Sequence, residues 1–237
     1  MAKLGKKYIE AAKLIDRDYT YRPEAAIDLA KKTAITTFDS SVEIHITTGA
    51  NPKHAEQQVR GVALLPHGLG KQVRVLVFAQ GDAARRAQEA GADFIGDDAT
   101  IEKIEEGWTA FDVAIATPDM MGKVGRLGRV LGRKGLMPNP RSGTIVAPDD
   151  VEQAVGDARK GRVEFRLDRT GVVHGVLGKA SFSKDQLTDN LASFIDALNQ
   201  AKPTGIKGTF LRSGSLATAM GPGIKLDMAA TASLKPR

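Results

Sequence analysis

The sequence predicts an α/β and α+β protein of two domains, in which a discontinuous α+β sandwich built from both termini is interrupted by an inserted domain with a doubly wound parallel sheet. Near both ends, apolar and polar residues alternate as in strands with one buried face, whereas residues 69–159 contain nearly continuous apolar runs separated by helical stretches. The charge divides at the same places. Residues 1–68 and 160–237 carry 22 Lys and Arg against 14 Asp and Glu, and residues 69–159 carry 12 against 14.

The N-terminal segment predicts two helices followed by two strands. The apolar face of the opening helix consists of Tyr8, Ile9, Ala12 and Ile15. A second helix is expected to begin at Pro23, because proline suits the first helical position. Residues 41–48 (SVEIHITT) alternate apolar and polar side chains with a period of two, and residues 59–65 form a second apolar strand.

The middle of the chain alternates strand and helix. QVRVLVFA, DFIG and DVAIA are apolar strands, DAARRAQEAG and TIEKIEEG have helical composition, and a further helix is expected over residues 150–160. Strands that alternate with helices in this way form parallel sheets, because each helix crosses over one face. The insertion is therefore predicted to span 69–159, and the outer domain 1–68 plus 160–237.

The C-terminal segment returns to the outer domain. RVEFRL and GVVHGVLG flank the turn DRTG and are predicted to form a hairpin. Ser183 and Gln186 form a capping box at the start of a long helix. A last strand pair covers residues 208–216 and 223–228, and the tail from Ala229 is expected to fray because it has little to bury.

Two glycine-containing crossings join the predicted domains. His67, Gly68 and Gly70 lie in the first crossing, and Gly161 lies in the second. Glycine and proline interrupt regular structure at these places. These residues are therefore predicted to form a hinge.

Composition favours a cytoplasmic protein with a polyanionic partner. The net charge of +6 and the pI near 9.5 favour nucleic acid or an anionic membrane, unless surface lysine only aids solubility. The absence of cysteine excludes disulfides, thiolate zinc sites and a cysteine nucleophile. The longest apolar run, Val75–Ala79, is far shorter than the ~20 residues that span a bilayer, and the basic opening lacks a signal-peptide core. We therefore expect neither a membrane partner nor export.

The segment GKVGRLGRVLGRKGLMPNPRSG (122–143) is basic and rich in glycine. Its cations are Lys123, Arg126, Arg129, Arg133, Lys134 and Arg141, and no acid occurs from residue 120 to 148. Glycine lets backbone amides approach phosphates, so a secondary nucleic-acid contact is expected; a solvated basic loop that only turns the chain is the alternative. The segment matches neither a Walker loop nor a dinucleotide fingerprint, so no cofactor is predicted.

No pattern of catalytic or metal-binding residues is present. The four histidines lack metal-ligand spacing, and no nucleophile motif such as Gly-x-Ser-x-Gly occurs. The sequence therefore predicts a protein that is not an enzyme and binds no metal. Two rival hypotheses are a nucleotide-dependent enzyme that uses the crevice of the inserted sheet and a DNA-binding regulator.

Candidate RNA-binding residues lie in the two outer segments. Phe38 precedes the first strand and suits stacking on exposed bases, although it could instead pack under a helix end. Arg166 and Asp168 lie in the predicted hairpin. The turn at 218–222 (TAMGP) holds a methionine that a turn does not need, beside a glycine that lets the backbone approach RNA closely.

Four separated motifs resemble one family. VRGVALLPHGLGKQVRVLVF, ATPDMMGKVGRLGRVLGRKGLMPNP, GKASF and KPTGIKGTFLRS occur in order over nearly the whole chain and closely resemble the ribosomal protein L-one family of bacterial type. The resemblance implies an RNA-binding domain made from both termini and an inserted Rossmann-like domain. It also implies a cytoplasmic constituent of the large ribosomal subunit, monomeric when free, that binds ribosomal RNA and other subunit components. The family forms the mobile stalk, takes part in release of exit-site tRNA, and represses its own operon by binding the messenger.

Carried over to this sequence, the resemblance implies RNA contacts at Phe38, Arg166, Asp168, His174, Lys179, Met220 and Gly221, and Thr218 beside them is a further candidate. Two positions depart from the family pattern. The family usually has Ser or Thr before Met-Gly, where this chain has Ala219, and it is open whether Thr218 replaces that hydroxyl. The family hairpin commonly has Arg-Asn-Asp, where this chain has Leu167 in place of the amide.

Overall fold

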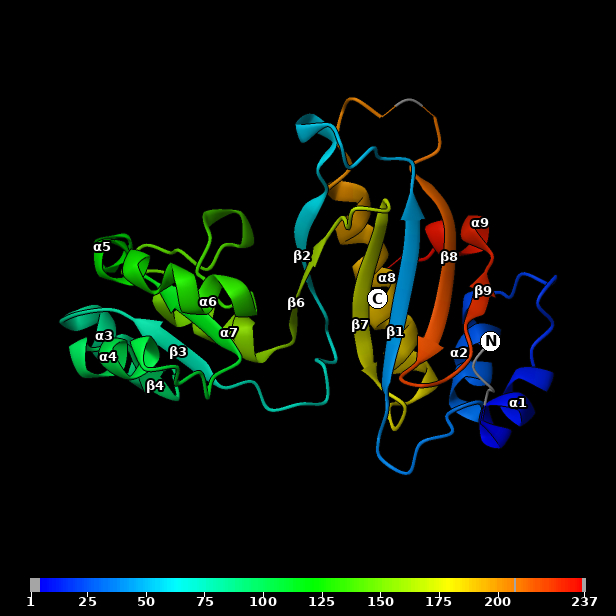
Figure 1. The fold of residues 1–237 in the computed structure, drawn as a ribbon, viewed down its shortest axis with the longest axis horizontal. Coiled ribbons are helices and arrows are strands. Elements are labelled where there is room, and N and C mark those ends of the chain that lie inside the picture. The colour runs from blue at the N-terminus through cyan, green and yellow to red at the C-terminus, as the bar shows by residue number, and fades with distance from the viewer. Residues whose placement is uncertain (1–4, 207, 236–237) are drawn as a thin grey trace. The chain divides into compact units, whose positions relative to one another are not determined.

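The fold is mixed α/β, with helices and three β-sheets among the residues that the structure describes (Figure 1). The structure is a computed structural model that describes residues 5–206 and 208–235; for Arg141 it describes the backbone but not the side chain. No helix within these ranges is long and apolar enough to cross a membrane.

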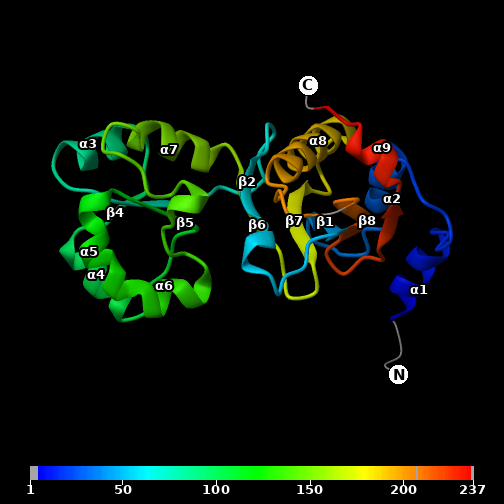
Figure 2. The ribbon, with the colours of Figure 1, turned by 90° about the horizontal axis from the view of Figure 1, so that it is seen from above.

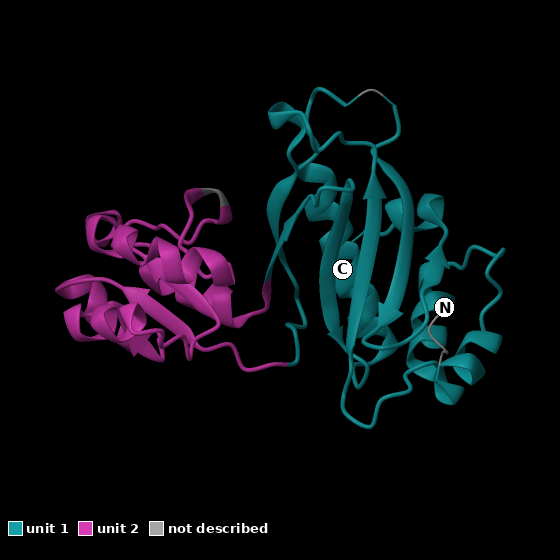
Figure 3. Ribbon diagram, in the orientation of Figure 1, with its two compact units in different colours: residues 1–70, 163–237 teal, residues 71–162 magenta. Residues whose placement is uncertain are grey.

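The chain forms two compact units (Figure 3). Unit 1 comprises residues 1–70 and 163–237, and unit 2 comprises residues 71–162, so each boundary lies two or three residues beyond the position expected from the sequence. Unit 1 carries 20 Lys and Arg against 14 Asp and Glu, and unit 2 carries 14 against 14. The whole net charge of +6 therefore belongs to unit 1.

The main sheet of unit 1 has four antiparallel strands in the order β7-β1-β8-β9. Its strands are β1 (Ser41–Thr48), β7 (Val172–Lys179), β8 (Leu211–Thr218) and β9 (Ile224–Leu226). A second sheet pairs β2 (Arg60–Leu64) with β6 (Arg162–Arg166). Because β1 lies between β7 and β8, segments from both ends of the chain complete one sheet.

Two helices, α2 (Pro23–Lys32) and α8 (Lys184–Gln200), lie on one side of the main sheet (Figure 2). The predicted start of α2 and the predicted capping box of α8 are both confirmed. The buried apolar side chains of α8 are Leu187, Leu191, Ala192, Phe194, Ile195 and Leu198. Burial of each large one stabilises the fold by about 1.5–3 kcal/mol. Alternate residues of β1 are only partly buried, so the other side of the sheet, here called the open face, is accessible to solvent.

The predicted hairpin over residues 162–179 is wrong. β6 pairs with β2 and β7 pairs with β1, and a single bridge between Leu167 and Val173 connects the two segments. β6 and β7 each have one apolar face. An apolar face favours burial but does not determine which neighbouring strand supplies the hydrogen-bonded partner. The DRTG turn therefore carries the chain from one sheet to another.

Two predictions for the termini of unit 1 are also corrected. In α1 (Lys6–Lys13), Ile9 is exposed at 42%, whereas the following Ile15 is buried. The tail does not fray over α9 (Met228–Ala232), because the Asp227 carboxylate accepts hydrogen bonds from the first backbone amides of this helix and Thr231 is fully buried. Residues 236–237 of the tail lie outside the described residues.

Unit 2 contains a parallel sheet in the order β4-β3-β5, with helices on both of its faces (Figure 2). Its strands are β3 (Val75–Phe78), β4 (Phe94–Ile95) and β5 (Val113–Ala116). Helices α3 (Asp82–Glu89) and α7 (Val151–Arg159) pack on one face, and α4 (Asp98–Glu105), α5 (Met121–Val124) and α6 (Gly128–Lys134) pack on the other. All four residues of β3 are buried, which explains its continuous apolar run.

The basic segment was expected to be a loop, and this is wrong for its first half. A short 3-10 turn at Pro118–Met120, helix α5, a second 3-10 turn at Gly125–Leu127 and helix α6 follow one another without a break. Other 3-10 turns lie at Ala55–Gln57 and Pro140–Ser142. The buried side chains of the helical run are Met120, Val124, Leu127 and Leu131, which recur at helical spacing. The chain leaves the helix at Gly135, which has a φ of +71°.

Candidate nucleic-acid interface

Five of the predicted RNA-contact residues lie at one end of the main sheet of unit 1. This strand-end cluster consists of Phe38, Lys179, Thr218, Met220 and Gly221. The residues meet because β1 begins where its antiparallel neighbours β7 and β8 end. Lys179 Nζ donates to Ser41 Oγ over 3.1 Å, which holds the ammonium group beside the start of β1.

Two large apolar side chains of this cluster are exposed to solvent. Phe38 is 60% exposed and Met220 is 76% exposed. Met220 also has a φ of +66°, an unfavourable value that no other described residue except glycine adopts. Because most of its side chain is exposed, Phe38 does not pack under a helix end. Exposed apolar side chains, one of them on a strained backbone, are typical of a binding surface.

The turn after β8 requires glycine at position 221. The backbone amide of Gly221 donates to the carbonyl oxygen of Thr218 over 2.8 Å, and a Cβ atom at position 221 would lie 2.2 Å from Thr218 Oγ1. Thr218 itself is buried, and its hydroxyl has no hydrogen-bond partner within the described parts of the chain. Thr218 thus lies under the turn and does not supply the surface hydroxyl that Ala219 lacks.

A second group of predicted residues lies along β7 and the turn before it. His174 is opposite His45 of β1, and their Nδ1 atoms are 2.9 Å apart. On the other side of the ring, His174 Nε2 lies 3.5 Å from Asp168 Oδ2. His45 was not among the predicted site residues. Its place on the polar face of β1 was visible in the sequence, but its contact with His174 depends on the pairing of β1 with β7.

Asp168 is ionised over the physiological pH range. Hydrogen bonds from the Thr170 hydroxyl, and from the backbone amides of Val172 and Thr170, lower the pKa of Asp168 to about 2. These contacts outweigh the partial burial that raises it. Asp168 therefore holds the turn before β7 and presents a negative charge to His174.

Arg166 and Leu167 lie outside both groups. Arg166 is the exposed last residue of β6, in the second sheet of unit 1. Leu167 is buried, and its backbone amide donates to the carbonyl oxygen of Val59. The departure from the family pattern at position 167 thus adds an apolar side chain to the core.

In unit 2, the helical half of the basic segment carries a repeated triplet. Val-Gly-Arg at 124–126 and Leu-Gly-Arg at 127–129 and 131–133 each place a buried apolar residue, a glycine and an exposed arginine in succession. The arginine row is Arg126, Arg129 and Arg133. Within the described residues no carboxylate pairs with this row, whereas the neighbouring Lys123 pairs with Asp98 at 2.6 Å.

A shallow cavity of about 290 Å³ lies beside the arginine row. It is lined by Arg129, Val130, Arg133 and Lys134, and Lys134 Nζ also donates to the Thr109 hydroxyl. Three of its four lining residues are cationic, which suits a phosphate group. The side chain of Arg141 lies outside the described residues.

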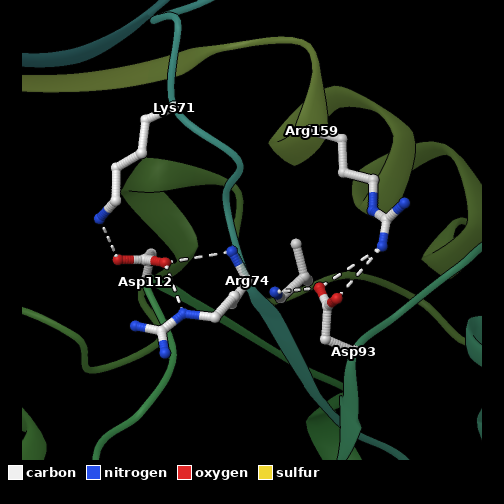
Figure 4. A network of polar contacts seen from close by, with 6 residues as sticks. Lys71, Arg74, Asp93, Asp112 and Arg159 are labelled. Carbon is white, nitrogen blue, oxygen red and sulfur yellow. Dashed lines mark hydrogen bonds and ion pairs between the residues drawn. The ribbon is translucent and has the colours of Figure 1, made fainter.

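The start of β3 in unit 2 is fixed by two carboxylates (Figure 4). Asp112 accepts from Lys71 Nζ at 2.6 Å and from Arg74 Nε at 3.2 Å. Asp93 Oδ2 accepts from the Val75 amide at 2.8 Å and lies 3.4 Å from the Arg159 guanidinium. Partial burial of Asp112 opposes its ionisation, but the hydrogen bonds from Lys71 and Arg74 prevail and lower its pKa to about 2.

The predicted hinge residues of the first crossing are held by helix α8 of unit 1. Asn190, which is fully buried, accepts from the His67 amide through Oδ1 and donates through Nδ2 to the Gly68 carbonyl oxygen, both over 3.1 Å. A Cβ atom at Gly70 would lie 2.8 Å from the Phe182 ring. In the second crossing, Gly161 has a φ of +101°. His67, Gly68 and Gly70 are therefore packed within unit 1.

No cluster of three or more metal-binding side chains occurs within residues 5–206 and 208–235. The buried core of unit 2 is filled by apolar side chains from both helix layers.

Comparisons with known proteins point to one family. The family description "Ribosomal protein L1p/L10e family" matches residues 30–222. The chain is 58% identical over 234 residues to "Large ribosomal subunit protein uL1" of Dehalococcoides mccartyi strain 195, which covers 99% of both chains. It is 52% identical over 236 residues to the protein of the same name from Chloroflexus aggregans, which covers 99% of this chain and 100% of that one. The similarity thus includes both units.

Proposed function

The chain belongs to the Ribosomal protein L1p/L10e family, and from this premise we propose that unit 1 binds large-subunit ribosomal RNA directly through the strand-end cluster and the open face of its main sheet. As a member of this family, the protein is a structural constituent of the large ribosomal subunit and not an enzyme. Its place is the ribosome, which is cytoplasmic in bacteria.

One observation carries the proposal: two exposed apolar side chains lie beside a lysine at the end of a sheet, in the unit that carries the whole net charge. Phe38 offers a ring on which an unpaired base stacks, Met220 offers an apolar side chain that packs against a base, and Lys179 offers a charge for a phosphate. Gly221 lets the backbone approach the same RNA closely. Sequence-specific recognition of RNA mostly uses unpaired bases, which suits this combination.

We further propose that unit 2 is an inserted Rossmann-like domain that contacts RNA more lightly. Its parallel order β4-β3-β5 between two helix layers supports the Rossmann-like description, and the arginine row supports a contact with phosphates. Movement about the two crossings, between Gly70 and Arg74 and near Gly161, would make unit 2 the movable part of a stalk. Release of exit-site tRNA is the role proposed for that movement.

Repression of the protein's own operon is proposed to use the same surface of unit 1. A messenger that presents a similar arrangement of unpaired bases would compete with ribosomal RNA for the strand-end cluster. Free protein, proposed to be a monomer, would then bind the messenger only when ribosomal RNA is saturated. Other components of the large subunit would contact the protein after it has bound RNA.

The test compares two substitutions in the cluster with one outside it. Phe38→Ala and Met220→Ala are each expected to weaken binding to large-subunit ribosomal RNA by on the order of 1–3 kcal/mol, because the first removes a ring that stacks on a base and the second a side chain that packs against one. Leu64→Ala is the control, since Leu64 of β2 is also large, apolar and 53% exposed. Filter binding at one salt concentration measures all three.

Two outcomes would contradict the proposal. An unchanged dissociation constant for both cluster variants would remove Phe38 and Met220 from the RNA site. Equal competition by duplex DNA at matched salt would mean that binding is not specific for RNA, because nonspecific attraction to phosphate is similar for both nucleic acids. Stronger competition by duplex DNA would favour the DNA-binding regulator.

A further inference from the structure

Two histidines on the open face of the main sheet continue a row of polar contacts that begins at Asp168. Asp168 Oδ2 lies 3.5 Å from His174 Nε2, and His174 Nδ1 lies 2.9 Å from His45 Nδ1. His45 Nε2, at the far end of the row, lies 3.9 Å from Glu43 Oε2. The row crosses from the turn before β7 to the central strand β1.

The carboxylate of Asp168 determines where the ring protons lie. An ionised carboxylate only accepts hydrogen bonds, so Asp168 favours the tautomer of His174 that has its proton on Nε2. Glu43 does not set the tautomer of His45 in the same way, because its carboxylate lies 3.9 Å from His45 Nε2, beyond hydrogen-bond distance. The Nδ1 atom of His174 is then an acceptor, and the proton between the two rings belongs to His45 Nδ1. A neutral His45 consequently has no proton on Nε2, which is left as a hydrogen-bond acceptor.

We infer that His45 Nε2 and the Glu43 carboxylate form a subsite that accepts hydrogen bonds from RNA, either from a ribose 2′-hydroxyl or from a base amino group. Both side chains are accessible, with exposures of 32% for His45 and 38% for Glu43. Two adjacent acceptors disfavour a phosphate group, which has only acceptors to offer. The inference rests on the proposed function, because it takes RNA as the ligand, and it deepens it by naming the RNA groups recognised here.

The surroundings of His45 disfavour its charged form. Burial is the largest cause that lowers the pKa of His45, and the repulsion that two charged rings would exert on each other, with His174 so close, lowers it further, whereas Glu43 opposes both. The groups that face His45 are Glu43 on its own strand, His174 on β7 with Asp168 behind it, and Ser215 on β8, with Lys225 of β9 opposite Ser215. When the pH falls below the pKa of His45, Nε2 gains a proton and the acceptor is lost.

Acidification therefore separates this subsite from a simple charge effect. If the histidines contributed only charge, their protonation would strengthen binding to a polyanion. If His45 Nε2 accepts a hydrogen bond, the same protonation weakens binding. The two expectations have opposite signs.

The experiment measures the affinity of the full chain for large-subunit ribosomal RNA from about pH 5 to 8, the range in which histidine titrates. It uses the wild type, His45→Asn and His45→Gln at constant salt. An Asn amide can keep the contact with His174 but provides no acceptor at the position of Nε2, whereas the Gln carbonyl oxygen can reach that position. At the upper end of the range, His45→Asn is expected to bind roughly 3- to 10-fold more weakly, and His45→Gln close to the wild type. Wild-type affinity falls on acidification, and both variants lose this fall.

Equal affinities of His45→Asn and the wild type, or wild-type affinity that rises on acidification, would overturn the inference and leave the proposed function standing. Failure of the wild type to bind ribosomal RNA at any pH would overturn both. Nitrogen-15 NMR of the free wild type provides a second measurement that needs no variant. A bare Nε2 on His45 at neutral pH supports the inference, and a protonated Nε2 contradicts it.

Discussion

Units 1 and 2 present their charged residues in different ways. In unit 1 the candidate contacts lie on strand ends and on an open sheet face, where cations are mixed with histidines, acids and exposed apolar groups. Unit 2 is neutral overall, but six of its cations lie within residues 123–141, where no acid occurs. Unit 1 thus offers varied chemistry in one place, and unit 2 offers charge alone.

The backbone shows the same difference. The candidate surface of unit 1 includes a strained Met220 and a glycine that has no substitute at position 221. The arginine row of unit 2 lies on the 3-10 turn Gly125–Leu127 and on α6, and Cβ atoms at the glycines of these two elements would meet no atom within 4 Å. A shaped surface discriminates between partners, whereas a row of charges attracts any polyanion. Recognition is therefore expected from unit 1 and general attraction from unit 2.

The largest effect is expected at the turn after β8. Gly221→Ala should weaken ribosomal RNA binding by about 2 kcal/mol or more, because the new Cβ clashes with buried Thr218 and displaces Met220. Gly223→Ala, two residues further on, is the matched control, since its Cβ would meet nothing within 4 Å. Titration of both variants with ribosomal RNA measures the difference. Equal affinities would show that the shape of this turn is not part of the interface.

A smaller effect, on stability alone, is expected in unit 2 at the start of β3. Asp112→Asn removes the ion pairs to Lys71 and Arg74 and should lower the free energy of unfolding by about 1–2 kcal/mol. The pKa of Asp112 is depressed from 3.8 to about 2. Its contribution is therefore fully present above pH 3.8 in the wild type and is lost as the pH falls toward 2.

The control for this prediction is Asp98→Asn. Asp98 pairs with Lys123, but its side chain is 72% exposed, so its removal should change stability little. Urea unfolding of both variants at neutral and acidic pH provides the comparison. An Asp112→Asn variant as stable as the wild type at neutral pH would show that the two ion pairs do not hold β3.

The smallest effect is expected within the arginine row. Gly132→Ala should stabilise unit 2 by about 0.5–1 kcal/mol, because alanine favours a helix and position 132 has open space around it. Gly135→Ala should destabilise it, since Gly135 has a φ of +71°. Thermal unfolding measures both. If Gly132→Ala also weakens RNA binding, the shape of this helix contributes to binding as well as its charge. Units 1 and 2 would then differ less in how they bind RNA.

Local patterns were sufficient to predict much of the fold. The alternation in β1 predicted a strand with one open face, the continuous apolar run predicted β3, and the capping box predicted the start of α8. The choice of strand partners was not predictable in this way. β6 and β7 are adjacent in sequence, but β6 pairs with β2 and β7 pairs with β1. These pairings depend on packing of the whole core, which local patterns do not specify.

The candidate site was also predictable only in part, because local patterns indicate single elements but not which elements lie side by side. The glycines of the basic segment suggested a loop, and the apolar residues at helical spacing, Val124, Leu127 and Leu131, were the signal that pointed to a helix. The strand-end cluster joins residues predicted one by one, and their gathering follows from the antiparallel pairing of β1. The contact between His45 and His174 depends on strand register, which a single sequence does not specify.

The most direct test of the division of roles removes unit 2. A variant that joins Gly70 to Val163 through a short glycine-rich linker keeps both segments of unit 1, and its affinity for ribosomal RNA is compared with that of the full chain at matched salt. We expect the variant to retain most of the affinity and to show a smaller dependence on salt, because the arginine row is gone. Loss of most of the affinity from a folded variant would contradict the account and place recognition in unit 2.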